Sequence, residues 1–195
     1  MRLRLPQTRT STLIGAAIFG VVIVVGVIIA VTQPANRAWA LIGTPVLCLI
    51  FAGMLATRTV LDADHGSITT TRVWVFRRRV DLASATRIAI GPNNNNRAVF
   101  GVRGSGGTVF VDLVHCSTGV NVALEPPALT ALADAVERFV PPAVPRRTEV
   151  VAQLRAQAAF LAGGGRPQDS PLAPMATASL VKAATNAESV FTMLA

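Results

Sequence analysis

Two runs of apolar residues near the N-terminus, residues 13–31 and 38–57, contain no charged side chain. At a rise of about 1.5 Å per residue, a helix over either run reaches across a hydrocarbon core of about 30 Å. The first run is rich in Val and Ile, but in lipid only a helix satisfies every backbone N–H and C=O group within one segment. The link between the runs is so short that two helices joined by it must be antiparallel. The pattern therefore predicts a two-helix transmembrane hairpin over residues 12–57, with the lipid bilayer as a partner.

Arginines flank this hairpin on the side of both termini. Three precede the first run in a basic segment over residues 1–11, and several follow the second run, whereas the link holds only Arg37. Positive charge collects in the cytoplasmic flanks of membrane helices. We therefore expect a multi-pass protein of the inner (plasma) membrane with both termini in the cytoplasm. A cleaved signal peptide is the alternative, since Ala38-Trp39-Ala40 fits a small-x-small cleavage site, but the second apolar run disfavours it.

After residue 58 the pattern changes to short segments that alternate between apolar and polar residues and are separated by turn residues. Alternation with a period of two is typical of strands, and a 3.6-residue period follows it over residues 126–139, where two prolines open a helix. We expect one soluble domain over residues 58–140. Its seven strands are expected at residues 59–62, 67–72, 73–80, 86–90, 98–103, 108–114 and 120–124.

The segment LDADHGSITTTRVWVFRRRVDLASATRIAI, followed by the helix PPALTALADAVERF, resembles the pleckstrin-homology-like (PH-like) domains of bacterial membrane proteins. The resemblance covers roughly residues 58–140. It implies a β-rich, partly open barrel of about seven antiparallel strands that is capped by a C-terminal helix. Relatives that bind phosphoinositides use basic residues around the first hairpin. Here that turn, residues 62–65, is acidic, so the familiar lipid-headgroup site is not expected.

The C-terminal tail, residues 141–195, is expected to combine helical and flexible parts. A helix is predicted over residues 146–162, a flexible linker over residues 166–174, and a second apolar stripe beyond it. That stripe is too short to be stable as a coiled coil by itself. It is either a helix that folds when it docks on a partner or part of a disordered tail, and the two hypotheses stay open. The stripe consists of Leu180, Ala184, Ala187, Phe191 and Leu194.

The most basic spot of the chain is Arg77-Arg78-Arg79, on an expected strand. Arginines near a membrane surface gain attraction from anionic lipid. Strand alternation, however, places Arg77 and Arg79 on one face and Arg78 on the other. A solvated strand end whose charges pair with Asp81 and other acids is therefore favoured over a membrane-surface or partner contact.

The sequence supplies no recognisable catalytic, cofactor-binding or metal-binding set. Residues 101–107 (GVRGSGG) look like a phosphate loop but lack the Lys-Ser/Thr of a Walker motif, and a hairpin turn is preferred. His65 and His115 have no second ligand at metal spacing. We expect no enzyme, no cofactor, no metal and no small-molecule substrate.

The net charge of +8 is spread along the chain, and half of it lies in the first 57 residues. Aromatic residues interleaved with basic ones, which single-stranded nucleic acid needs for stacking, are nearly lacking, so no nucleic-acid partner is expected. The leading hypothesis is a membrane-anchored PH-like interaction module at the cytoplasmic face that binds a protein or the membrane surface. The alternative is an accessory subunit of a larger membrane complex.

Overall fold

The computed structural model describes residues 2–5, 9–32, 35, 37–38, 42–46, 48, 58–72, 76–93, 96–117 and 120–177. The chain divides into two compact units. One contains Gln7–Arg58 and Thr71–Arg77, and the other contains Met1–Pro6, Thr59–Thr70 and Arg78–Ala195. Each unit is described by itself below.

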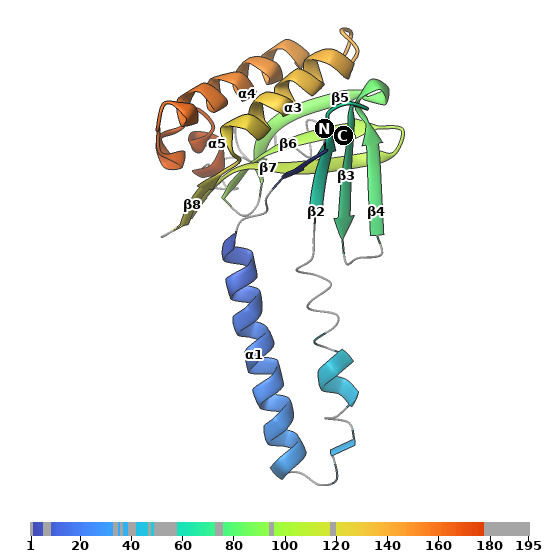
Figure 1. The fold of residues 1–195 in the computed structure, drawn as a ribbon, viewed down its shortest axis with the longest axis vertical. Coiled ribbons are helices and arrows are strands. Elements are labelled where there is room, and N and C mark those ends of the chain that lie inside the picture. The colour runs from blue at the N-terminus through green and yellow to red at the C-terminus, as the bar shows by residue number, and fades with distance from the viewer. Residues whose placement is uncertain are drawn as a thin grey trace, which may run out of the picture. The chain divides into compact units, whose positions relative to one another are not determined.

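Helix α1 (Arg9–Thr32) follows the first apolar run (Figure 1). Its backbone approaches the second run closely at Gly26, where an added Cβ atom would overlap the side chain of Thr44. Only a glycine allows so close an approach. Other side chains of α1 are exposed, among them Val24 at 57% and Val31 at 69%.

The expected transmembrane hairpin is corrected by the structure. In the second run the described helical residues are 38, 42–46 and 48. Among the described residues no helix is both long and apolar enough to cross a membrane. The hairpin and the multi-pass inner-membrane location are therefore not retained.

The first sheet has the strand order β1-β2-β3-β4. Its members are β1 (Arg2–Leu5), β2 (Arg58–Asp62), β3 (Ser67–Arg72) and β4 (Phe76–Asp81). Strand β1 pairs antiparallel with β2, and Leu3 lies opposite Leu61. From the sequence, this N-terminal segment is expected only as a basic flank of the hairpin. Its Arg-Leu-Arg-Leu alternation, however, has the period of a strand. Strand β4 is the last strand in this order.

The second sheet has the order β5-β6-β7-β8, and all its neighbouring strands are antiparallel. Its members are β5 (Arg87–Asn93), β6 (Arg97–Gly104), β7 (Gly107–Ser117) and β8 (Val120–Ala123). Gly104 lies opposite Gly107, so Ser105 and Gly106 form a two-residue hairpin turn, as expected from the sequence. A register shift between Ala98 and Val99 marks a β-bulge, which places two residues of β7 opposite one of β6.

Three helices and two short 3-10 turns complete the fold. Turn η2 (Leu82–Ser84) joins the two sheets, and α3 (Pro126–Phe139) and α4 (Arg147–Ala162) lie side by side (Figure 1). The last described elements are η3 (Pro167–Asp169) and α5 (Ala173–Thr177). Both α3 and α4 confirm the helices that the apolar period predicted.

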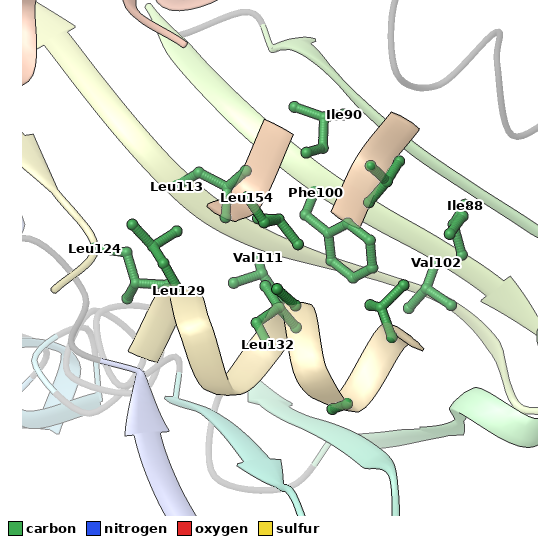
Figure 2. Close-up of a cluster of buried hydrophobic side chains, with 14 of the residues drawn as sticks. Ile88, Ile90, Phe100, Val102, Val111, Leu113, Leu124, Leu129, Leu132 and Leu154 are labelled. Carbon is green, nitrogen blue, oxygen red and sulfur yellow. The ribbon is translucent and has the colours of Figure 1, made fainter. Parts of the chain in front are cut away.

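The core forms where α3 and α4 cover one face of the β5–β8 sheet. Figure 2 shows Phe100 and Val111 of the sheet facing Leu132 of α3 and Leu154 of α4. All four are at most 2% exposed. At about 25 cal/mol per Å², burial of large side chains such as these stabilises the fold by roughly 1.5–3 kcal/mol each.

The expected partly open barrel is also corrected. In the described part of the chain the strands form two separate four-stranded sheets, eight strands in all. Three further α-helices and two short 3-10 helices follow α1. The capping role expected for one helix is shared, since α4 and α5 enter the same core as α3. The linker over residues 166–174 was expected to be flexible. Instead, Leu172 and Ala173 are buried, and Gln157 of α4 accepts the Leu172 N–H at 3.2 Å through Oε1.

Candidate interaction surface

The three arginines of β4 are all exposed in the structure. Among the described residues these arginines form no ion pair with Asp81, whose Oδ1 accepts the Ala83 N–H at 3.1 Å and caps η2. Since β4 ends its sheet, even Arg78, which alternation places on the face of buried Val80, can reach water at the edge.

The tip of the β6–β7 hairpin lies directly against β4. A Cβ atom on Gly106 would overlap Arg79 O, and one on Gly104 would lie 3.1 Å from Val80 Cγ1. Glycines at both positions therefore let the hairpin backbone approach the β4 backbone closely. This contact brings the β6–β7 turn next to the backbone of Arg79.

Hydroxyl groups hold this junction together. Ser84 donates through Oγ to Asp81 O at 2.8 Å, and its Oγ lies 3.0 Å from Ser105 Oγ. The Thr86 N–H donates to Arg103 O at 2.8 Å. The backbone of β6 is thereby fixed relative to η2 and to the start of β5.

Two further arginines meet at this junction through strand pairing. Arg87 of β5 lies directly opposite Arg103 of β6, and both are exposed. Directly opposed residues in an antiparallel pair share one face of the sheet. We call the set Arg78, Arg79, Arg87 and Arg103 the basic rim.

A second polar cluster surrounds the β-bulge. Arg97 donates through Nη1 to Asp112 Oδ2 at 2.5 Å, and His115 lies opposite Arg97. Burial lowers the pKa of His115, the positive charge of Arg97 lowers it further, and Asp112 opposes both. Arg97 Nε and His115 Nδ1 are buried without a hydrogen-bond partner among the described residues. Because Asp112 already neutralises Arg97, this cluster adds no net charge that would attract an acidic partner.

Arg155 ties α4 to α3 on the opposite part of the domain. Its Nη2 donates to Asp134 Oδ1 at 3.1 Å and to Glu137 Oε2 at 2.5 Å. These hydrogen bonds raise the pKa of Arg155, the one to Asp134 most. Two acidic side chains therefore balance the charge of Arg155.

The remaining candidate groups of the sequence carry no site. His65 is exposed, and its Nδ1 lies 3.2 Å from Asp62 Oδ1 within the same turn. Cys116 is buried, and burial raises the pKa of its thiol, which disfavours the reactive thiolate. No group of three His, Cys, Asp or Glu side chains that could hold a metal occurs among the described residues.

The apolar tail stripe lies outside the described residues, which end at Thr177. That prediction therefore stays a prediction. The sequence reasoning singled out the β4 arginines but missed Arg87 and Arg103, since they are isolated in the sequence. The hairpin turn expected at residues 104–107 does locate one of them: Arg103 directly precedes this turn, so it must lie at the hairpin tip.

Comparison with models of protein families, with curated proteins and with solved structures finds no match to this chain.

Proposed function

We propose that this chain is a non-catalytic interaction module whose basic rim binds an acidic segment of a partner protein. The observation that carries the proposal is that the tip of the β6–β7 hairpin packs against the backbone of Arg79, while Arg87 lies opposite Arg103 next to the same tip. All of these side chains, and that of Arg78, are exposed. Arginine suits this role because its planar guanidinium donates two parallel hydrogen bonds to a carboxylate.

The charge balance around the rim supports an acidic partner. Its four arginines come from three strands, and the carboxylate next to them along the chain, Asp81, accepts the Ala83 N–H. Exposed like charges in one place repel one another weakly, and an anionic partner relieves that repulsion. The resemblance to PH-like domains, which stays a prediction, favours the same class of interaction module.

The test removes the same number of charges at two places. One full-length variant carries Arg78→Gln, Arg79→Gln and Arg103→Gln. The matched control carries Arg138→Gln, Arg146→Gln and Arg166→Gln, which are exposed arginines of the α3–α5 region. Proteins captured from nuclease-treated extract of native cells are compared by quantitative mass spectrometry.

We expect acidic proteins that the wild type and the control retain to be lost from the rim variant. Retention of these proteins should fall as salt is raised, because the distance over which exposed charges interact is about 8 Å at physiological ionic strength and shorter at higher ionic strength. If the rim variant retains the same proteins as the wild type, the proposal is wrong. If capture depends on nucleic acid that nuclease removes, the partner class is wrong.

A further inference from the structure

The segment that follows α4 is docked on the core through few side chains. It comprises residues 166–177, which include η3 and α5, and we call it the strap (Figure 1). The strap side chains buried in the core are Leu172, Ala173 and Ala176, each at most 3% exposed. Two of these three are alanines, so the strap buries little apolar surface for its length.

The backbone hydrogen bonds of the strap lie within the strap itself, apart from one at Leu172. The Asp169 N–H donates to Arg166 O at 3.0 Å. The Ala173 N–H donates to Ser170 O at 2.9 Å. Hydrogen bonds between residues so close in the chain persist when the whole segment moves. The strap can therefore leave the core without losing its own local structure.

Gln157 of α4 makes the polar contact that fastens the strap. Its Oε1 accepts the Leu172 N–H at 3.2 Å, and its side chain is fully buried. The other end of the same amide, Nε2, is buried and has no hydrogen-bond partner among the described residues. A buried donor without an acceptor destabilises the closed arrangement, and solvent satisfies that donor once the strap moves away. The fastening contact is therefore partly offset by its own cost.

Three glycines, Gly163–Gly165, connect α4 to the strap. Gly164 has a φ of +80°, and nothing lies within 4 Å of a Cβ atom added to it. A glycine in open space changes its backbone angles without steric cost, which is what a hinge requires.

Cys116 of β7 contacts the strap from the side of the sheet. Its Sγ lies 4.0 Å from Pro167 O, and the residue is only 6% exposed. We propose that the strap opens about Gly164 as a unit while α3, α4 and the β5–β8 sheet stay folded, and that Gln157 holds it closed. The open state uncovers Cys116 and the apolar core beside it. This device goes beyond the proposed function, because no residue of the basic rim takes part in it.

The experiment follows alkylation of Cys116 by a maleimide in the folded full-length chain, and mass spectrometry assigns the modified cysteine. A short peptide with one cysteine, treated in the same solutions, corrects for effects on the chemistry. Opening of the strap exposes little surface, whereas unfolding of the whole domain exposes much and depends steeply on urea. We therefore expect the wild-type rate to be almost constant at low urea concentrations.

Two buried leucines supply a matched pair of variants. Leu172→Ala removes the largest apolar contact of the strap, so alkylation of Cys116 should become about tenfold faster or more. Leu132→Ala makes the same change at a fully buried position of α3. It should lower the free energy of global unfolding and leave the alkylation rate nearly unchanged.

A second pair tests the fastening residue. Gln157→Ala should also accelerate alkylation of Cys116, because the Leu172 N–H loses its acceptor. Gln153→Ala, at a half-buried position one turn earlier on α4, should not. Circular dichroism confirms that each variant is folded.

A wild-type rate that rises with urea as steeply as global unfolding overturns the inference, since Cys116 would then be exposed only when the whole domain unfolds. This measurement decides even if a variant fails to fold. Equal acceleration in Leu172→Ala and Leu132→Ala has the same meaning. An unchanged rate in Gln157→Ala overturns the part assigned to Gln157.

Discussion

Gly66 holds the turn between β2 and β3 in a conformation that other residues avoid. Its φ is +58°, and a Cβ atom there would overlap the ring of Phe139 at the end of α3. The Leu82 N–H donates to Gly66 O at 2.8 Å, so the turn also fixes η2. One glycine thereby joins the first sheet, the linking turn and a core helix.

We expect Gly66→Ala to lower the free energy of unfolding by about 2–5 kcal/mol. The left-handed conformation costs about 1–2 kcal/mol, and overpacking against Phe139 adds about 1–3 kcal/mol. Gly164→Ala is the control, because Gly164 also has a positive φ (+80°) but has nothing within 4 Å of the added Cβ. Denaturant unfolding followed by circular dichroism measures both. An equal loss of unfolding free energy in Gly66→Ala and Gly164→Ala would show that Phe139 does not contact the side chain added at position 66.

His115 makes stability depend on pH. Burial and the charge of Arg97 lower its pKa in the folded state below about 6.5, the value of an unfolded chain. The unfolded state then binds the proton more readily, so the stabilisation is complete above about pH 6.5 and is lost as the pH falls toward the lowered pKa. His115→Gln should flatten the decline of the unfolding free energy below pH 6.5.

The control for this pH effect is His65→Gln, because the His65 side chain is 72% exposed. Thermal unfolding at a series of pH values measures how steeply the stability of each variant falls as the pH is lowered. A slope in His115→Gln as steep as in the wild type would assign the dependence to other groups.

At the scale of elements, α1 and the segment around Thr44 depend on a glycine contact. Gly26→Leu should push this segment away from α1, because even a Cβ atom would overlap Thr44. Cys48, four residues after Thr44, is only 8% exposed. We expect its alkylation by a maleimide to become faster in the variant.

Gly20→Leu is the control for this change, since nothing lies within 4 Å of a Cβ atom at Gly20. Cys116, buried in the other unit, reports any general unfolding in the same mass spectrum. Unchanged alkylation of Cys48 in Gly26→Leu would contradict the contact. The exposed valines of α1 form an apolar surface of the kind that meets another molecule.

For the whole molecule, the distribution of charge matters more than the net value of +8. Arg155 is held by two acids and Arg97 by one, and these arginines serve the fold. Asp81, beside the arginines of β4, accepts the Ala83 N–H through Oδ1 and caps η2. The exposed arginines of the basic rim are therefore the part of this charge distribution on which the proposed function rests.

Local periodicity in the sequence determined the seven strands after residue 58 and the helices α3 and α4, because a period of two or 3.6 needs no knowledge of distant residues. The tertiary structure alone decided which strands pair. It placed β1 beside β2, Arg87 opposite Arg103 and α5 in the core, and it separated the strands into two sheets where a barrel was expected. The physical reason is that register and helix docking depend on contacts between residues far apart in the chain, which no local pattern records.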